Sequence, residues 1–393
     1  MCGKRAHGSE ESGYEGACKV SSFSDFTLLV DGGNAFNEIL ACIDGAKRSV
    51  KINMFIWRED EIGKRLASAL LGAAERGVRV EISVDRYGIL LENVEECRKS
   101  FFHRKLTLIE KIKVWALKLI YPQKGAPRRV KDEYCELART LLSHPLITVE
   151  ADVFKADHSK YYIIDDEILI LGGINVEDKE IVGDLQGRAY QDYMAKLVGK
   201  AYVDAFNAYM VGGNRQNGDY YFAANTKNPY RFDMKSAYLE LIESAKEYLY
   251  ITMAYFSPLK EFEEAILRAY RRGVKVTITI PERANFQNDT NRLTVRSLMK
   301  QSNNGICVYL SPKMLHTKLM ASESLLSFGS TNITKKAFSQ LSELNLFVRN
   351  IPCPFVDGLL GSVQENIALS KQITDYKQLK YRRYFALLES TVV

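Results

Sequence analysis

The chain has few histidines and lacks the sequence patterns that mark metal sites and membrane-spanning helices. Only 5 histidines occur among its 393 residues. No apolar run reaches about 18 residues, the length that a helix needs to cross a bilayer, so we expect no segment to span a membrane. There is no His-Glu-x-x-His pattern and no dense acidic cluster. We therefore expect neither a metal nor another cofactor.

Cysteines are too scattered for a zinc site or a disulfide framework. Their number, 7, is odd, and no Cys-x-x-Cys pair is present. They are Cys2, Cys18, Cys42, Cys97, Cys135, Cys307 and Cys353. This usage is typical of reduced thiols in a cytoplasmic protein. Residues 1–26 are interpreted as a polar tail without the order of a signal peptide, so we expect peripheral contact with the inner face of the cell membrane at most.

Two short stretches carry the same set of functional groups. Each has a histidine, a lysine two residues later, a carboxylate seven residues after the histidine, and an asparagine in a glycine-led turn. The two sets are His158, Lys160, Asp165 and Asn175, and His316, Lys318, Glu323 and Asn332. A single His-x-Lys pair is commonly a surface histidine beside a solvated lysine, but two copies with matching downstream residues indicate a shared function.

The residue types in each set suit the chemistry of a phosphate ester. Hairpins are predicted from strands 161–164 and 168–171, and from 319–321 and 325–328. Histidine and lysine at positions i and i+2 of an extended strand point to the same face. The imidazole can attack phosphorus or move a proton, the ammonium can neutralise a non-bridging oxygen, and the asparagine amide can donate a hydrogen bond. One copy supplies half of a phosphate site.

The similarity between the two copies extends upstream of the motifs. Residues 46–56 resemble residues 245–255, and residues 76–82 resemble residues 272–278. In both halves, helical periodicity is followed by a β-branched strand. Helices are predicted over 34–48, 63–76, 233–247 and 260–272, and strands over 78–84 and 274–280. This alternation predicts an α/β fold with one helix-covered sheet in each half.

Chain length and turn-forming residues predict two domains. At 393 residues, two units of about 190 residues each fit the usual size of a domain. Glycine, asparagine and proline are concentrated in residues 212–230, which favours a boundary there. We expect a first domain over 27–215, interrupted by a basic amphipathic insertion at about 92–145, and a second domain over 216–393.

The doubled motif resembles the signature of the phospholipase D superfamily, His-x-Lys-x4-Asp followed by Gly-Gly-x-Asn or Gly-Ser-x-Asn. Residues 158–175 match it fully, whereas the second copy has Glu323 in place of the usual aspartate. The resemblance implies that Asp165 and Glu323 brace the site rather than react, and we expect both in buried structural pairs. It also places Asp192 and Glu343 where the superfamily has an acidic residue that orients a catalytic imidazole.

Further stretches are similar to bacterial cardiolipin synthases. They are residues 55–63, 73–78 and 85–88, within a likeness that spans about 27–350. This resemblance implies two phospholipase D-like domains, each a mixed sheet flanked by helices, related by a pseudo-twofold axis with one active site at their interface.

The resemblance also implies a two-step phosphatidyl transfer. His158 attacks the phosphorus of phosphatidylglycerol, and His316 protonates the departing glycerol and then activates a second phosphatidylglycerol, which yields cardiolipin. One imidazole must start neutral and the other charged. Lys160, Lys318, Asn175 and Asn332 would hold the non-bridging oxygens, and no metal is needed.

A basic segment interrupts the first half. Between Lys99 and Lys131, 10 lysine or arginine residues occur with the single acid Glu110. Residues 101–121 combine lysines with large apolar side chains, including Trp115. A helix of this composition suits the headgroup layer of an anionic membrane, which predicts membrane contact through about 99–131. An ordinary helix packed on the domain with a solvated basic face explains the composition equally well.

Three other functions remain open. A phospholipase D-type hydrolase would pass the same intermediate to water. A nuclease of the superfamily would use the basic segment as a phosphate track, but small nucleases of this type carry one motif copy and dimerise, so we expect no nucleic acid partner. A lipid-binding or scaffolding protein that has lost activity is the non-enzymatic alternative, and Glu323 is the feature in its favour.

Overall fold

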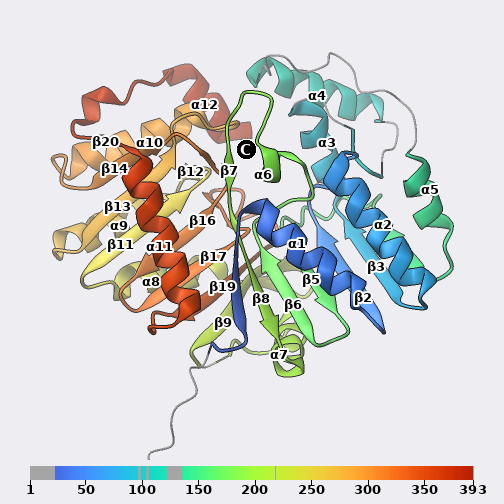
Figure 1. Cartoon of the computed structure of the whole chain (residues 1–393). Coiled ribbons are helices and arrows are strands. Elements are labelled where there is room, and N and C mark those ends of the chain that lie inside the picture. Colours follow the sequence, from blue (N-terminus) through green and yellow to red (C-terminus); the bar gives the residue numbers. More distant parts are fainter. Residues whose placement is uncertain (1–22, 96–98, 103–105, 122–134, 217, 393) are drawn as a thin grey trace, which may run out of the picture.

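Two α/β halves lie side by side in the computed structural model, which describes residues 23–95, 99–102, 106–121, 135–216 and 218–392 (Figure 1). Each half contains one large mixed sheet. Apolar residues form one core between each sheet and its outer helices, and a third core between the inner faces of the two sheets. The result is a sandwich of helices, sheet, sheet and helices, which confirms the predicted fold.

The first half is built on a seven-stranded sheet with the order β1-β8-β6-β5-β2-β3-β4. Its elements are β1 (Phe26–Val30), α1 (Asp31–Asp44), β2 (Ser49–Met54), α2 (Glu61–Glu75), β3 (Arg79–Val84), α3 (Arg86–Val94), α4 (Leu108–Ile120), α5 (Glu136–Ser143), β4 (Ile147–Glu150), β5 (Tyr161–Ile164), β6 (Ile168–Gly172), α6 (Lys179–Val182), β7 (Tyr190–Gln191), β8 (Tyr193–Val198) and α7 (Lys200–Met210).

The second half is built on a nine-stranded sheet with the order β10-β9-β19-β17-β16-β11-β13-β14-β20. Its elements are β9 (Tyr220–Lys227), β10 (Tyr230–Phe232), α8 (Met234–Ser244), β11 (Tyr248–Met253), β12 (Phe256–Ser257), α9 (Lys260–Arg271), β13 (Lys275–Pro281), α10 (Asn288–Gln301), β14 (Cys307–Ser311), β15 (Met314–Leu315), β16 (Lys318–Ser322), β17 (Leu325–Gly329), β18 (Ile333–Thr334), β19 (Glu343–Arg349), α11 (Pro354–Leu369), β20 (Lys371–Ile373), η1 (Tyr376–Gln378) and α12 (Arg383–Val392).

The two sheets repeat one topology. The run β8-β6-β5-β2-β3-β4 corresponds to β19-β17-β16-β11-β13-β14, with the same parallel and antiparallel senses throughout. The predicted helices and strands upstream of the motifs are present, and their ends lie within four residues of the predictions. A domain boundary at residue 215 stays a prediction.

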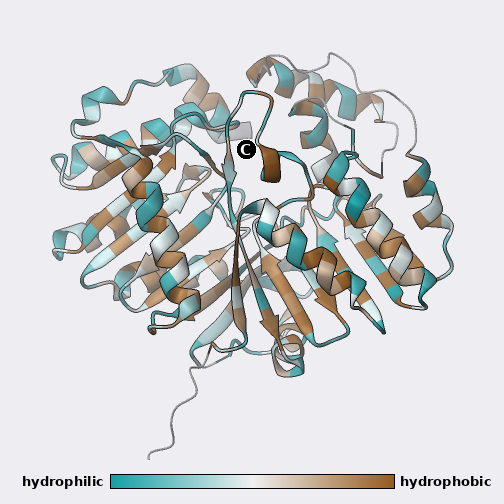
Figure 2. Ribbon diagram, viewed as in Figure 1, coloured by the Kyte–Doolittle hydropathy of each residue, from teal (hydrophilic) through white to brown (hydrophobic). Residues whose placement is uncertain are grey.

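Local sequence explains why these elements form, as α2 shows. Asp60 caps its first turn by accepting from the Gly63 N–H at 3.1 Å. Ile62, Leu66 and Leu70 recur at the spacing of one helical face and are buried against the sheet. Gly77 ends the turn with φ of +93°, which favours glycine. Figure 2 shows the complementary pattern in the sheets, whose central strands are largely hydrophobic.

The basic insertion differs from its prediction at its start. Phe101 and Phe102 do not join a helix but are buried against Trp57 in the core of the first half. Helix α4 begins only after Thr107, where a capping box with Glu110 satisfies the free N–H groups. The remainder of the insertion at 96–98, 103–105 and 122–134 lies outside the described residues.

No helix within the described ranges is both long enough and apolar enough to cross a bilayer. Four of the predicted reduced thiols are free cysteines: Cys42, Cys135, Cys307 and Cys353. The other three cysteines lie outside the described residues.

Candidate active site

Each histidine of the doubled motif lies against a carboxylate from the opposite half of the molecule. His158 Nδ1 is 3.1 Å from Glu343 Oε2, and His316 Nδ1 is 3.0 Å from Asp192 Oδ2. All four side chains are buried. The structure thus brings the two predicted carboxylates to the two histidines, with the partners crossed between the halves. Their role in orienting the imidazoles stays a prediction.

Short backbone contacts between the halves create this arrangement. On one side, β7 pairs in parallel with β15, which puts His316 next to Asp192. On the other side, a parallel bridge joins Asp157 to Ser342, and the His158 N–H donates to the Ser342 carbonyl at 2.8 Å. The same kind of contact therefore aligns each histidine with its carboxylate.

Lys160 and Lys318 are wholly buried beside the histidines. Each ammonium donates to the carbonyl of the histidine two residues earlier, at 2.5 Å for Lys160. Lys318 Nζ also lies 3.3 Å from Asp192 Oδ2. Burial, followed by the charge of Lys318, lowers the pKa of Lys160 to about 7. Two buried cations in one place are unfavourable alone, and a negatively charged phosphodiester would offset that cost.

Asn175 and Asn332 lie in the same site with hydrogen-bonding capacity left. The turn before Asn175 needs glycine, because a Cβ at Gly173 would overlap the carboxylate of Asp192. Asn175 Nδ2 donates to Glu177 Oε1 at 3.2 Å. The Oδ1 atoms of both asparagines are buried and have no hydrogen-bond partner in the described part of the chain. Such atoms normally find a partner, which a ligand could supply.

Asp165 and Glu323 lie away from the histidines, at the turns that precede β2 and β11. Asp165 accepts from the backbone N–H groups of residues 47, 48 and 49 at 2.8, 2.6 and 2.9 Å. Glu323 accepts from those of residues 246, 247 and 248 at 2.9, 3.2 and 3.4 Å. Both are partly exposed, so the expectation of buried pairs is wrong. The additional methylene of Glu323 leaves this bracing contact in place, with longer hydrogen bonds.

The protein's own groups favour the neutral form of both histidines. Burial, followed by Lys160 and Lys318, lowers the pKa of His158 well below 6.5. Burial, followed by Lys318 and Lys179, does the same to the pKa of His316. The expected split into one neutral and one charged imidazole is therefore not provided by the protein alone. The negative charge of a bound phosphodiester would raise both pKa values.

Glu180, in α6, also lies beside the second histidine, which the sequence did not predict. Glu180 Oε1 lies 3.4 Å from His316 Nδ1. Burial, followed by Glu177 and Asp192, raises the pKa of Glu180 well above 4.5. His316 therefore faces two carboxyl groups. The only signal in the sequence is the charged run 177–180 after the first motif, and such runs are usually solvated.

A buried cluster of ion pairs, which the sequence did not predict either, supports Asn175. Arg58 Nε lies 2.5 Å from Glu177 Oε2, and Lys179 Nζ lies 2.5 Å from Glu95 Oε2. All four side chains are buried. Because Glu177 also accepts from Asn175, the cluster fixes the amide of that residue. Buried charges are tolerated when they are paired in this way.

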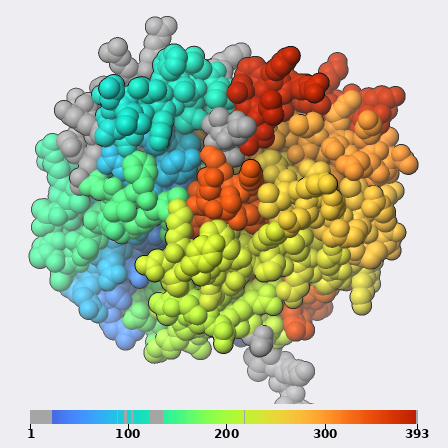
Figure 3. All heavy atoms as spheres, turned by 180° about the vertical axis from the view of Figure 1, so that it is seen from behind, coloured from blue at the N-terminus to red at the C-terminus, as the bar shows by residue number. Residues whose placement is uncertain are grey.

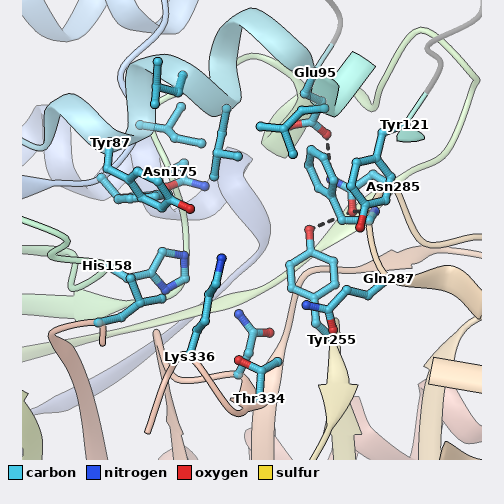
Figure 4. Close-up of a pocket in the computed structure, with 18 of the residues that line it drawn as sticks. Tyr87, Glu95, Tyr121, His158, Asn175, Tyr255, Asn285, Gln287, Thr334 and Lys336 are labelled. Carbon is cyan, nitrogen blue, oxygen red and sulfur yellow. Dashed lines mark hydrogen bonds between the residues drawn. The ribbon is translucent and has the colours of Figure 1, made fainter. Parts of the chain in front are cut away.

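One cavity of about 570 Å³ brings the two motif copies together (Figure 4). Both histidines and both asparagines line it. The wall formed by α3 and α4 is mainly apolar and contains Leu90, Leu91, Ala116, Leu117 and Ile120. Polar residues that line the cavity include Glu95, Tyr255, Asn285, Thr334 and Lys336. Within the described ranges, no group of three His, Cys, Asp or Glu side chains is arranged to hold a metal ion.

Comparison with known proteins agrees with this geometry. The family model described as cardiolipin synthase, PLD-like domain, matches residues 39–187 and 238–356. The cardiolipin synthase of Clostridium perfringens is 26% identical over 83% of this chain and 67% of its own length. Cardiolipin synthase B of Salmonella typhi is 26% identical over 95% of this chain and 88% of its own length.

Two solved structures share the fold at low sequence identity. Phosphatidylserine synthase of Haemophilus influenzae has a TM-score of 0.62 at 11% identity, covering 94% of this chain and 91% of its own. Polyphosphate kinase of Porphyromonas gingivalis has a TM-score of 0.53 at 12% identity, covering 93% of this chain and 53% of its own. These likenesses show the fold alone. Because the family model matches well over half of the chain, the protein belongs to the cardiolipin synthase PLD-like domain family and is a cardiolipin synthase-like enzyme of the phospholipase D superfamily.

Proposed function

We propose that this enzyme makes cardiolipin by transferring the phosphatidyl group of one phosphatidylglycerol to another through a covalent phosphatidyl-histidine. The observation that carries the proposal is the pair of histidines in one cavity, each against a carboxylate of the opposite half. The names of the relatives supply the lipid class. Two histidines at one phosphate suit a reaction with two successive displacements.

The hydrogen bonds of His158 suit a nucleophile. Its Nδ1 lies 3.0 Å from the carbonyl oxygen of Ser330. A carbonyl can only accept, so this contact favours the tautomer in which Nδ1 carries the proton. Nε2 then keeps its lone pair for phosphorus. In the first step Nε2 bonds to phosphorus, and the bond from phosphorus to the glycerol oxygen breaks.

The surroundings of His316 suit an acid and then a base. Once a phosphodiester has raised its pKa, the carboxylate of Asp192, 3.0 Å from Nδ1, favours the imidazolium. His316 gives its proton to the departing glycerol. It then takes a proton from the hydroxyl of the second phosphatidylglycerol, whose oxygen bonds to phosphorus as the bond to His158 breaks. Lys160, Lys318, Asn175 and Asn332 would stabilise the charge on the non-bridging oxygens.

The apolar wall of the cavity favours transfer over hydrolysis. Leu90, Leu117 and Ile120 line the space where the second alcohol must arrive. A lipid can displace water from such a wall because its apolar parts gain by burial. A hydrolase is the second candidate, since the same intermediate would react with any water that entered.

We further propose that α4 binds the surface of an anionic bilayer. Its outward face exposes Leu108, Ile109, Ile112, Trp115 and Leu119, each between 57% and 74% accessible. Lys111 and Lys118 lie on the same helix, which suits anionic headgroups. Figure 3 shows α4, in turquoise, at the surface of the molecule. Val114 and Leu117 pack inward, which leaves the opposite face of the helix for the proposed contact.

A product assay tests the function. Purified enzyme is incubated with phosphatidylglycerol vesicles and, separately, with single- and double-stranded DNA. Free glycerol released with an equal amount of cardiolipin supports transfer. Phosphatidic acid without cardiolipin would establish the hydrolase instead, and nicked DNA with unchanged lipid would overturn a lipid substrate.

A further inference from the structure

Lys336 is a cation of the cavity that the doubled motif does not include. It follows Asn332 by four residues and lines the cavity together with Thr334. Figure 4 shows its side chain directed into the cavity, between His158 and Tyr255. The residue is half-buried.

The proposed transfer brings a second phosphate into this cavity. The acceptor phosphatidylglycerol carries its own phosphodiester, which stays intact while its glycerol hydroxyl reacts. Lys160 and Lys318 are wholly buried at the histidines and serve the phosphate that reacts. An anion that enters an apolar cavity needs a cation or several hydrogen bonds there.

Three lysines, Lys113, Lys179 and Lys336, are among the described residues that line the cavity. Lys179 is held by carboxylates, with Glu95 Oε2 at 2.5 Å and Glu177 Oε1 at 3.2 Å. Lys113 is exposed on α4, where water weakens its interaction with an anion. Lys336 is the one that is both half-buried and directed into the cavity.

The loop that carries Lys336 is well ordered by its own hydrogen bonds. The carbonyl of Lys336 accepts from the N–H groups of Ser339, Gln340 and Leu341 at 3.2, 2.8 and 3.1 Å. The same loop leads to Glu343, the residue beside His158. The backbone that carries Lys336 is therefore held at a fixed position relative to the nucleophile, which a binding residue needs.

We infer that Lys336 binds the phosphate of the acceptor lipid and so makes a second phosphate subsite, which selects a phospholipid acceptor over free glycerol or water. This inference rests on the proposed transferase function. Burial lowers the pKa of Lys336, and an anion bound beside its ammonium would raise that pKa again. An acceptor with a phosphate supplies that anion, whereas glycerol does not.

A competition between two acceptors tests the inference. Fluorescent phosphatidylglycerol serves as the donor, and unlabelled phosphatidylglycerol and deuterated glycerol are offered together. Mass spectrometry gives the ratio of fluorescent cardiolipin to fluorescent phosphatidylglycerol that has gained deuterated glycerol. Both products come from one intermediate, so the ratio does not depend on how much of a variant folds.

Lys336→Gln should lower this ratio on the order of 10- to 100-fold, the loss typical of one charge-assisted hydrogen bond. Lys336→Arg should keep the ratio close to that of the wild type. Lys335→Gln, at the exposed lysine immediately before it, should leave the ratio unchanged. A ratio for Lys336→Gln equal to that of the wild type would overturn the subsite. Failure of the proposed function gives a different result, because the wild type itself would then form no cardiolipin. That result would also overturn the subsite.

Discussion

His316 of the second half lies 3.0 Å from Asp192 of the first half, so neither half holds a complete histidine site of its own. His158 has the reverse relationship with Glu343. A gene duplication product with two independent sites would keep each carboxylate with its own histidine. The crossed pairs instead make each half depend on the other for the carboxylate beside its histidine.

Asp192→Asn should lower kcat on the order of 10²- to 10⁴-fold, because an amide cannot stabilise the imidazolium that a general acid needs. The measurement is cardiolipin formed per folded enzyme at saturating lipid. Asp204→Asn, at an exposed carboxylate on α7, serves as the control. A loss confined to KM would show that Asp192 contributes to binding and not to proton transfer.

Glu343→Gln should change how stability depends on pH. Burial raises the pKa of Glu343 from 4.5 to about 8, so between these values the folded protein holds a proton that the unfolded chain has lost. This group therefore makes folding less favourable as pH rises from 4.5 to about 8. Glutamine carries no such proton, so the variant should gain stability relative to the wild type across that range. Urea unfolding at pH 5, 6.5 and 8 measures the difference, which would stay constant if Glu343 were ionised throughout.

Replacing two apolar residues on the outward face of α4 should weaken membrane binding. Ile112→Ser combined with Trp115→Ser removes two side chains whose burial is worth about 1.5–3 kcal/mol each, so vesicle affinity should fall at least about tenfold. Sedimentation with phosphatidylglycerol vesicles measures it. Val211→Ser, at a residue that is 78% exposed elsewhere, is the matched control. Equal binding by all three proteins would rule out α4 as the contact.

Arg58→Met should destabilise the fold by about 3–5 kcal/mol, because Glu177 and Glu95 would lose a buried partner. Arg79→Met, at an exposed arginine on β3, should change the free energy of unfolding by no more than about 0.5 kcal/mol. Chemical denaturation of both variants gives the comparison. A small effect at Arg58 would indicate that the two carboxylates are protonated or hydrated in the folded protein.

Local pattern was enough to predict much of this molecule. The i, i+2 spacing of histidine and lysine, together with strand-forming neighbours, predicts that both side chains point the same way, and in the second copy His316 and Lys318 both lie against Asp192. The upstream repeat correctly predicted two sheets of one topology. These features depend on residues close in sequence, where periodicity and turn chemistry are strongest.

Features that depend on distant contacts were beyond the sequence. The charged run around Glu180 gives no sign that α1 and β7 pack against it. The carboxylates of Asp165 and Glu323 were expected in buried pairs, but each braces a turn that is distant in sequence. The turn lies 117 residues upstream of Asp165 and 75 residues upstream of Glu323. Helix α4 starts later than predicted because Phe101 and Phe102 gain more by packing on Trp57.

The most direct test of the account is to trap the covalent intermediate. A phosphatidyl ester of p-nitrophenol needs no acid to release its alcohol, so His316→Ala should still react with it once and then stall for lack of a base. Peptide mass spectrometry should find the phosphatidyl group on His158, and His158→Ala should carry none. A label on His316 of the His158→Ala variant, or rapid turnover without any label, would contradict the account.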